Sequence, residues 1–561
     1  MLAPPRESPW PYGVAALVGA LSAGVLLGSD AVNPRRTDWL LHGDAATHLL
    51  GWLFLRNAPP AEAARGVAGD YLFPVGVSVA LTDSIPLVAL PLRALSPLLG
   101  RPFQYFGLWL VLAFALQGAA GVRLLGAAGV SPPWRALGAV LFVLFPPLAW
   151  RLAAPDLGHA SLCMHAPLLL GLAWALEEGP PPPLRHARWC ALTLATAAVH
   201  VYLAAMVTLL YAADSGRRAW SARAGAAFVE LAPVALSVGA TAAVLAWLGV
   251  LVGARGGPGG YGFYVASLDA LVESRGFSAW VPALRVEAAQ TEGYGYLGLG
   301  ASLVVLAALA ARAFDPRTPS APSRWRFVAL VSCAFALFAL SSSVRLGSAV
   351  VLDAGALSRP FEPALRALRA TGRFVWVPLY ALLAWAVREV ASRGRGRALL
   401  ALCAAAQAAE MLPAFARWEP PAPRAWRASH PAWRASAGRY RHLSVLPARF
   451  VNTACRSPAM PWPSFVGFGL LAAENRWTFN GGYSGRPPRE AIERYCAAAL
   501  ASARRGERRD DTVYVFATGA LYEEFQRAAG ASVRCGELDG ARTCVAAARP
   551  SPLRDALSGG R

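Results

Sequence analysis

An acid and a histidine lie one helical turn apart near the start of the chain, in the string Trp39-Leu-Leu-His-Gly-Asp-Ala-Ala-Thr-His48. Asp44 and His48 share one face if this segment is helical, and Gly43 lets the backbone approach a ligand closely. A carboxylate in this setting can act as a general base or bind a metal ion. The alternative is that Asp44 caps a helix while His48 faces lipid headgroups.

Two further stretches carry ionisable residues beside apolar runs. Arg151, Asp156 and His159 lie between two such runs, where ionisable groups are costly and often functional. An Arg151–Asp156 ion pair, with His159 at the start of the next helix, explains the same residues without a function. Asp83 precedes Ser84 and a proline-containing segment, a pattern typical of a helix start, and we expect it to cap that helix.

A later acid, Glu292, opens another apolar run and follows a loop that carries Tyr261, Tyr264 and Glu273. An acid at the start of a helix often only offsets the helix dipole, so Glu292 has both a structural and a catalytic interpretation. We keep Glu292 as a catalytic candidate and Tyr261 as a further candidate in this loop.

The segments around these residues are those of a membrane protein. The 561-residue chain is 56% hydrophobic with a mean hydropathy of +0.40, and apolar runs long enough to span a bilayer core recur along it. We expect about eleven crossings, at 14–27, 104–125, 137–150, 160–176, 189–200 with 201–213 as a broken pair, 226–252, 294–311, 327–341, 374–390 and 398–415. The apolar segments 39–56 and 85–99 contain charges or prolines, and we expect them to lie in the membrane interface.

The distribution of arginine sets the orientation of these crossings. The net charge is +20, and every basic residue is arginine, in an alanine-rich composition that favours a bacterial source and hence the inner membrane. The loops that contain Arg185, Arg217, Arg324 and Arg395 fall on one side, which the positive-inside rule makes cytoplasmic. Because topology accounts for the positive charge, we do not expect a nucleic-acid partner.

The same register leaves four loops on the outer face, at 28–102, 151–159, 253–293 and 342–373. The last of these ends in Arg366, Arg369 and Arg373, against the positive-inside rule. Guanidinium groups there can hold a phosphate through two parallel hydrogen bonds. They can equally be side chains of an amphipathic helix whose charged ends reach out to water.

The tail, 416–561, reads as a small α/β domain outside the membrane, after a transmembrane domain that covers 1–415. We expect strands at 442–450 and 512–518, a helix at 521–529, and a hairpin at 532–547 that turns at Asp539-Gly540.

Four cysteines lie in this tail, namely Cys455, Cys496, Cys535 and Cys544. Cys535 and Cys544 flank the expected hairpin turn. In an oxidising compartment such thiols usually form disulfides, so we expect Cys535–Cys544 across the hairpin and Cys455–Cys496 as a second pair.

The strings HGDAATHLLGWLFLR, LTDSIPL, FQYFGLW, EGYGYLGLG and TGRFVW resemble the GT-C superfamily of membrane glycosyltransferases, most closely an uncharacterised bacterial GT-C-like family of unknown substrate. The resemblance implies a mainly α, polytopic transmembrane helical bundle with a small C-terminal periplasmic α/β domain. It also implies transfer of a sugar from a polyprenyl-phosphate donor to a periplasmic or lipid-linked acceptor. Asp44 matches the first-loop acid that serves as base or metal ligand, Asp156 the second-loop acid and Glu292 the later acid.

The residues support this chemistry independently of the resemblance. A lipid-linked sugar would place its phosphate at the interface, where Arg151, Arg369 and Arg373 are the candidate ligands. A carboxylate that takes the acceptor's hydroxyl proton as the phosphate leaves is a general base, a role we assign to Asp44 with His48 beside it. The sequence contains no nucleotide-binding loop, which favours a lipid donor. The need for a divalent metal stays open.

Two other functions use the same residues. A transporter or lipid flippase would line a translocation path with these acids and arginines. No inverted repeat is visible, and the large outer loop with an exported domain favours an enzyme. A non-catalytic GT-C scaffold in glycan assembly is the other alternative, and in every case the lipid bilayer is a partner.

Overall fold

The structure is a computed structural model in which the chain forms two compact units. Unit 1 comprises 1–36, 104–244 and 258–419, and unit 2 comprises 37–103, 245–257 and 420–561. The structure describes residues 8–558 except 154–157, 222–223, 252–260, 285–287, 315–322, 362–364, 366–367, 418–424, 452 and 456. The first outer loop, which we expected to belong to the membrane domain, therefore folds with the tail.

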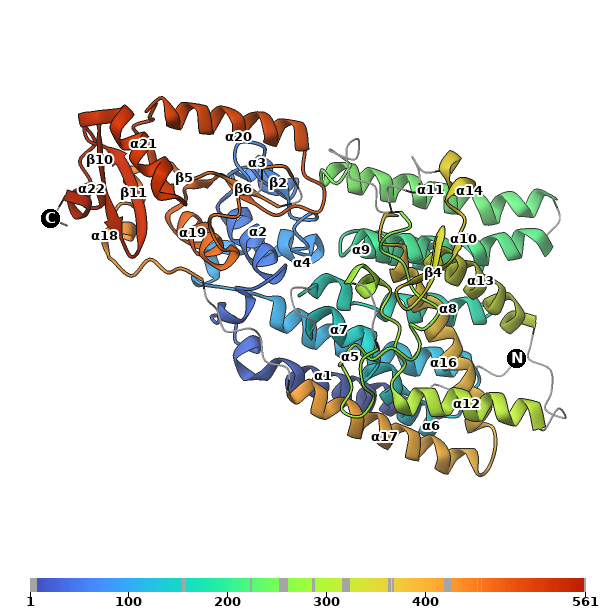
Figure 1. The fold of residues 1–561 in the computed structure, drawn as a ribbon. Coiled ribbons are helices and arrows are strands. Elements are labelled where there is room, and N and C mark those ends of the chain that lie inside the picture. The colour runs from blue at the N-terminus through green and yellow to red at the C-terminus, as the bar shows by residue number, and fades with distance from the viewer. Residues whose placement is uncertain are drawn as a thin grey trace. The chain divides into compact units, whose positions relative to one another are not determined.

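Unit 1 is a bundle of helices. They are α1 (Trp10–Val32), α5 (Phe106–Ala127), α6 (Pro132–Val143), α7 (Pro146–Ala153), α8 (Ala166–Leu176), α9 (Pro182–Ala197), α10 (Val201–Ser221), α11 (Ala224–Trp247), α12 (Leu299–Phe314), α13 (Ser323–Leu340), α16 (Trp376–Ala391) and α17 (Gly396–Ala416). A hairpin of β3 (Ser343–Leu346) and β4 (Ala349–Asp353), then the short helix α14 (Gly355–Ser358), lie between α13 and α16. Figure 1 shows α12 and α17 side by side, and the two helices are in extensive contact.

Seven stretches of the described residues are long and apolar enough to cross a membrane, fewer than the eleven crossings expected. They are Trp10–Val32, Phe106–Ala127, Pro132–Leu152, Ala227–Trp247, Ser323–Leu340, Thr371–Ala391 and Gly396–Ala416. The apolar helices at Ala160–Leu176 and Leu299–Phe314 are shorter. The expected break near His200 is present, because α9 ends at Ala197 and α10 begins at Val201.

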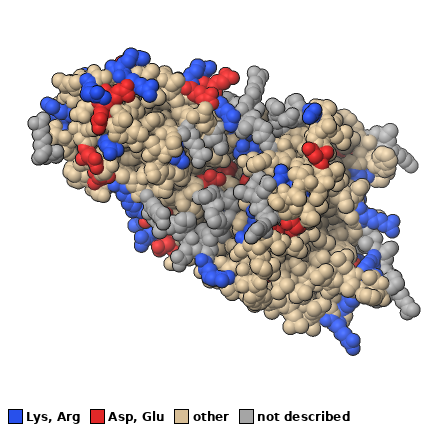
Figure 2. All heavy atoms as spheres, in the orientation of Figure 1, with Lys and Arg blue, Asp and Glu red and all other residues tan. Residues whose placement is uncertain are grey.

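The outer faces of several helices are apolar and exposed. On α11, Phe228 and Leu236 are each 74% exposed, and on α13, Leu330 and Leu337 are each 70% exposed. Large exposed apolar faces are rare on water-soluble proteins but are what lipid-facing helices require. Figure 2 shows wide tan areas over the helical unit, with blue side chains along its right-hand rim. Unit 1 therefore has the surface of a multi-pass membrane protein.

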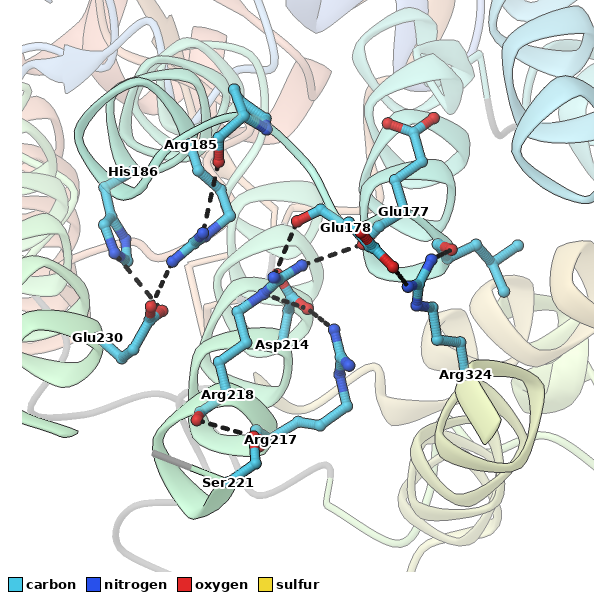
Figure 3. A network of polar contacts seen from close by, with 12 residues as sticks. Glu177, Glu178, Arg185, His186, Asp214, Arg217, Arg218, Ser221, Glu230 and Arg324 are labelled. Carbon is cyan, nitrogen blue, oxygen red and sulfur yellow. Dashed lines mark hydrogen bonds and ion pairs between the residues drawn. The ribbon is translucent and has the colours of Figure 1, made fainter. Parts of the chain in front are cut away.

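Charged side chains join the ends of several helices into one network, which we call the arginine end (Figure 3). Arg123, at the end of α5, pairs with Glu177 after α8 at 2.5 Å. Arg218 of α10 donates to the backbone oxygens of Glu177 at 3.0 Å and Glu178 at 2.9 Å, and Arg324 of α13 pairs with Glu178. The arginine-bearing loops that the sequence puts on one side of the membrane thus meet at one end of the bundle.

Unit 2 has helices and short strands from the first loop and from the tail. The first loop contributes α2 (Ala45–Asn57), α3 (Pro60–Ala64), β1 (Val67–Ala68), β2 (Val77–Ser78) and α4 (Pro86–Ala94). The tail contributes α18 (Ala432–Ala435), β5 (His442–Leu446), β6 (Arg449–Phe450), α19 (Trp462–Asn475), β7 (Thr478–Phe479), β8 (Gly481–Gly482), α20 (Arg489–Arg504), β9 (Thr512–Phe516), α21 (Gly519–Ala529), β10 (Val533–Leu538), β11 (Ala541–Ala546) and α22 (Pro552–Ser558). Its five-stranded sheet has the order β10-β11-β9-β5-β7, with β7, β5 and β9 parallel.

The local predictions for the tail are confirmed. The expected strand at 442–450 is divided into β5 and β6, the strand at 512–518 is β9, and the helix at 521–529 is α21. The hairpin of β10 and β11 turns at Asp539 and Gly540, whose φ angles of 49° and 74° are both positive. Positive φ at both central residues is the geometry that an Asp-Gly turn supplies.

The first loop completes the sheet of the tail. Phe73 donates its backbone N–H to the oxygen of Phe479 in β7 at 2.9 Å, and Phe479 donates to the oxygen of Asp70 at 2.8 Å. Leu50 and Phe54 of α2 lie in the same core as the aromatic residues of the tail. α2, which lies in the segment 39–56 that we expected in the membrane interface, is buried on most sides within unit 2.

Candidate functional site

Three of the candidate residues meet in unit 1 to form what we call the arginine–glutamate centre: Arg151, Glu292 and Arg373. One terminal nitrogen of Arg151 donates to Glu292 Oε2 at 2.6 Å, and the other donates to the backbone oxygen of Glu292 at 2.6 Å. Arg373 Nε donates to the same Oε2 at 2.7 Å. Three segments that are distant in the sequence therefore share one carboxylate.

Two glycines bring the segments of Glu292 and Arg373 together. Glu292 lies in the 3₁₀ turn η4 (Ala288–Gly293), and Arg373 lies in the 3₁₀ turn η7 (Thr371–Val375). A Cβ atom added to Gly372 would lie 2.7 Å from the Cα of Gly293. A Cβ atom added to Gly293 would lie 2.4 Å from the Cα of Ala266. Because backbones this close leave no room for a side chain, both positions need glycine, and Glu292 comes within reach of Arg373.

The other end of the glycine-rich string 292–300 is fixed to α17. Gln407 donates to the backbone oxygen of Leu297 at 3.2 Å. Glu410 accepts hydrogen bonds from the Tyr296 hydroxyl and from the backbone N–H of Leu299, both at 2.6 Å. Since Gln407 and Glu410 are fully buried, they fix the path of the string that leads away from Glu292.

Both guanidinium groups of the centre also lie over aromatic rings. Arg151 is 5.1 Å from the ring centre of Trp376, and Arg373 is 4.5 Å from that of Tyr202. Such cation–π contacts favour a fixed position for a buried guanidinium group. The Tyr202 hydroxyl accepts a hydrogen bond from the backbone of Ala370 at 2.8 Å, which ties α10 to the segment before Arg373.

The charge state of Glu292 follows from these contacts. Burial by itself would raise the pKa of Glu292, but the guanidinium groups of Arg151 and Arg373 hold it well below its ordinary value. A carboxylate with so low a pKa is a poor general base at neutral pH. The geometry therefore favours a role in which Glu292 orients the two arginines over a role as catalytic base.

Two histidines lie near the centre. His159 donates its backbone N–H to the oxygen of Arg151 at 2.8 Å and directly precedes the 3₁₀ turn η3 (Ala160–Cys163). His200 is buried between α9 and α10, within electrostatic range of Arg373. Asp156 and Arg366 lie outside the described residues, and among the described residues Arg151 pairs with Glu292.

Several buried polar atoms near the centre have no hydrogen-bond partner among the described residues. They are Ser161 Oγ, His165 Nε2, Thr371 Oγ1 and Trp376 Nε1. The His165 ring lies 4.2 Å from the Trp376 ring, and its Nδ1 shares a 2.7 Å hydrogen bond with the Tyr380 hydroxyl. Because buried polar groups nearly always have partners, these atoms are candidates to bind a polar ligand or water.

Asp44 and His48 lie in unit 2. His48 donates its backbone N–H to the oxygen of Asp44 at 3.2 Å, so the two residues share the first turn of α2, as expected. Asp44 occupies the N-cap position of α2, as the structural alternative expected, but its carboxylate makes no capping hydrogen bond. His48 is 1% exposed, so its side chain is buried and does not lie on the surface. Trp462 Nε1 donates to the oxygen of Gly43 at 3.3 Å, and the tail thereby supports this turn.

The prediction that Asp83 caps a helix is wrong. α4 begins at Pro86, with Ile85 before it, because proline is favoured in the first turn of a helix. Asp83 has a φ of 54°, in the left-handed region that a tight turn requires. Thr82 packs so closely on α2 that its Oγ1 would be 2.2 Å from a Cβ at Gly51.

The remaining candidates of unit 1 have different neighbours. Arg369 lies 5.5 Å from the ring centre of Tyr264, whose backbone oxygen accepts from the N–H of Gly372 at 2.9 Å, so both are next to the centre. Tyr261 packs against a phenylalanine of α13. Glu273 is buried and accepts from the backbone N–H of Arg275 at 2.5 Å.

Both expected disulfides are present. The Cα atoms are 6.2 Å apart in Cys455–Cys496 and 4.1 Å apart in Cys535–Cys544, whose residues are directly opposite each other in the β10–β11 hairpin. Within the described ranges, no group of three or more His, Cys, Asp or Glu side chains could hold a metal ion.

Four residues that support the centre were not singled out from the sequence: Tyr202, Trp376, Gln407 and Glu410. A signal was available for Gln407 and Glu410, which are polar residues three positions apart in an otherwise apolar run. Tyr202 and Trp376 carried no signal, because aromatic residues are common in apolar helices.

Comparison with known families covers most of the chain. Residues 16–412 match a domain of unknown function, DUF6311, and residues 432–546 match the DUF6311 C-terminal domain. No curated protein matches the chain. The residues between the two matched regions, 413–431, include the end of α17 and the boundary between unit 1 and the tail. Because the first match covers more than half of the sequence, the chain belongs to the DUF6311 family.

Proposed function

We propose that the protein is a membrane glycosyltransferase that moves a sugar from a polyprenyl-phosphate donor to an acceptor hydroxyl. The observation that carries this proposal is the arginine–glutamate centre, in which two arginines share one buried carboxylate within a unit of candidate membrane helices. Arginine binds phosphate with directed hydrogen bonds, and a fixed guanidinium group loses little entropy when it does so.

The two arginines have different roles in this proposal. Arg151 is 1% exposed and uses both terminal nitrogens on Glu292, so it anchors the carboxylate and is not itself a phosphate ligand. Arg373 is oriented by Glu292 and lies near Arg369, which is half-buried in the same segment. We assign the donor phosphate to Arg373 and Arg369.

The directions of the helices support a site on the outer side of the bacterial inner membrane. The arginine end gathers the C-terminal ends of α8 and α10, whereas the centre gathers the segments before α10, α12 and α16. If the arginine end faces the cytoplasm, as the positive-inside rule requires, the centre faces the periplasm. Polyprenyl-phosphate sugars serve as donors on that side in the GT-C enzymes that the sequence resembles.

Asp44 is the base in this mechanism. The acceptor oxygen attacks the anomeric carbon, Asp44 takes the hydroxyl proton, and the polyprenyl phosphate leaves with the electron pair of the broken C–O bond. This role comes from the resemblance. The low pKa of Glu292 argues against that acid as the base.

The test is complementation of a deletion strain, read out by mass spectrometry of lipid-linked sugars and surface glycans. We expect the deletion to accumulate a polyprenyl-phosphate sugar and to lose a glycan. Asp44→Asn should restore the protein level but not the glycan, with transfer reduced on the order of 10²-fold or more. Asp38→Asn is the matched control, because Asp38 is a more exposed acid of the same loop.

Arg373→Ala tests the other half of the proposal. The loss of a phosphate contact should raise the donor KM before it lowers the chemical rate. If Asp44→Asn and Arg373→Ala both restored the glycan fully, the glycosyltransferase proposal would be wrong. If the deletion changed the distribution of a lipid between leaflets without changing any glycan, a transporter would replace it.

A further inference from the structure

We propose that residues 343–361 insert into the lipid headgroup region and form a membrane contact beside the arginine–glutamate centre. We call this segment, which contains β3, β4, α14 and the turn after it, the apolar hairpin. It exposes a set of large apolar side chains, namely Leu346, Val350, Val351, Leu352, Leu357 and Phe361. Each of these is between 49% and 78% exposed, far more than a water-facing surface usually gathers in one place.

The pattern of exposure along β4 identifies lipid as the occupant. The β3–β4 register pairs Leu352 with Val344 and Val350 with Arg345, and it shifts between these two pairs. Because paired residues share a face and the successive residues Val344 and Arg345 point to opposite faces, Leu352 and Val350 present apolar groups on both faces. All five residues of β4 are exposed. A protein partner that packed on the hairpin would explain one apolar face, whereas immersion in lipid explains both.

The apolar hairpin continues a surface that already faces lipid. It begins directly after α13, whose Leu337 is 70% exposed three residues before the helix ends. The backbone N–H of Ala354 donates to the oxygen of Ser342 at 2.7 Å, which returns the chain to the end of α13. The hairpin therefore starts and finishes at the end of a candidate membrane span.

The backbone limits how deep the hairpin can lie. A two-stranded hairpin has edge N–H and C=O groups outside its ladder, and these cannot be satisfied in the hydrocarbon core. At the level of the headgroups, water and lipid phosphates can satisfy them, and Arg345 and Arg359 in the same segment are suited to the phosphates. We therefore assign the hairpin to the interface and not to the centre of the bilayer.

One loop supports both the hairpin and the centre. The backbone oxygen of Tyr264 accepts from Gly372, next to Arg373, at 2.9 Å. Four residues later, the N–H of Leu268 donates to the oxygen of Arg345 in β3 at 2.8 Å. A lipid-borne substrate that diffused along the hairpin would arrive beside Arg373. This last step rests on the proposed function, but the lipid contact does not depend on which reaction the protein performs.

The experiment measures how close lipid comes to the hairpin. A variant in which Cys163, Cys190, Cys333 and Cys403 are replaced by Ala keeps both disulfides and provides a background for single labels. In it, Leu352→Cys carries an environment-sensitive fluorophore, and the protein is reconstituted into phosphatidylethanolamine–phosphatidylglycerol vesicles that contain spin-labelled phosphatidylcholine. Leu337→Cys on α13 is the lipid-facing control. Glu490→Cys on α20, whose native side chain is 92% exposed, is the water-facing control.

We expect spin-labelled lipid to quench Leu352→Cys to an extent comparable with Leu337→Cys, and a shallow spin label to quench it more than a deep one. Glu490→Cys should respond only to aqueous iodide. If Leu352→Cys responded to iodide and not to lipid, the hairpin would lie in water and the proposal would be wrong. Protection from both quenchers would also overturn it, because a second protein chain would then cover the hairpin. Val350→Cys repeats the measurement if Leu352→Cys fails to fold.

Discussion

Glu292 changes its expected role once its neighbours are known. As an acid before an apolar run, it had a catalytic and a structural interpretation. Its contacts with Arg151 and Arg373 instead make it the residue that holds two guanidinium groups in one place. The cost of burying any of these charges alone is several kcal/mol, so each depends on the other two.

Glu292→Gln tests this interdependence through its pH dependence. Because the folded-state pKa lies well below the ordinary value of 4.5, the carboxylate stabilises the fold fully above that value. This stabilisation is lost as the pH falls below 4.5 towards the folded-state pKa. We expect Glu292→Gln to cost about 3–5 kcal/mol at neutral pH, the usual loss for a broken buried pair.

Thermal unfolding in detergent between neutral and acidic pH measures this effect. The difference between the native protein and Glu292→Gln should shrink as the pH falls. Glu490→Gln is the control, since its exposed carboxylate should leave the unfolding temperature nearly unchanged at every pH. A difference for Glu292→Gln that stayed constant over the whole range would contradict the assignment of a buried, ionised Glu292.

At the scale of elements, local signals in the sequence were sufficient for part of the fold. The Asp539-Gly540 turn and its cross-strand disulfide were predictable because turn chemistry depends on adjacent residues. The break at His200 was predictable from the polar residue between two apolar runs. Four of the predicted crossings do not have the length or the apolar composition of a membrane span. The helices α8 and α12 are short. The helices α9 and α10 contain buried charged residues such as Arg185 and Asp214.

Pairings between distant segments could not be predicted from the sequence. The addition of Tyr71 to the edge of β7 depends on a partner far along the chain, and alternation of side chains does not identify that partner. The contacts of the arginine–glutamate centre could not be predicted either. Ionisable groups are costly among apolar residues, and this cost identified Arg151, Glu292 and Arg373 as separate candidates. It did not show that Arg151 pairs with Glu292.

Gly372→Ala tests how the two 3₁₀ turns of the centre dock. The new Cβ would lie 2.7 Å from the Cα of Gly293, so the backbones must separate and Arg373 must move away from Glu292. Overpacking of this kind typically costs about 1–3 kcal/mol. We expect a lower unfolding temperature together with a loss of function in the complementation assay.

Gly394→Ala is the matched control for this substitution, because no atom lies within 4 Å of a Cβ at that position. It should leave both readouts unchanged. If Gly372→Ala behaved like Gly394→Ala, the close contact between the two turns would not determine the position of Arg373.

The two disulfides should contribute unequally to the stability of the tail. Cys455–Cys496 closes a loop with a sequence separation of 41, against 9 for Cys535–Cys544. Loop-closure entropy then predicts a loss of about 4 kcal/mol for Cys455→Ala with Cys496→Ala, and about 3 kcal/mol for the other pair. Chemical denaturation of each double variant measures these losses, and peptide mapping without reductant establishes which bonds form. Four alkylatable thiols in the native protein would contradict both bonds.

At the scale of the whole molecule, the arginine end restricts the topologies that the chain can adopt. Residues in mutual contact cannot lie on opposite sides of a membrane. Arg123, Arg218 and Arg324 all contact Glu177 or Glu178, so the ends of α5, α8 and α10 and the start of α13 share one side. The positive-inside rule alone could not link these loops, because it treats each loop separately.

The direction of α17 bears on the expected topology of the chain. Arg397, in its first turn, lies 5.5 Å from the ring centre of Trp134 at the start of α6, and α6 follows the end of α5 that carries Arg123. α17 therefore starts at the arginine end, and its 21 residues form a candidate membrane span that leads away from it. On the proposed topology, we expect the C-terminus to be periplasmic.

Reporter fusions test this topology directly. Alkaline phosphatase, which is active only after export, should be active when fused after Val272 or at the C-terminus, and inactive after Arg217 or Arg324. A fluorescent protein that matures in the cytoplasm should give the reverse pattern. Because contacts join the arginine-bearing ends, fusions after Arg217 and Arg324 must agree with each other whatever their side. If those two fusions disagreed, the arginine end itself would be wrong. If they agreed but the C-terminal fusion fluoresced, α17 would not cross the membrane. The tail, with Asp44 in its unit, would then face the cytoplasm. A polyprenyl-phosphate donor on the outer side could not reach Asp44 there.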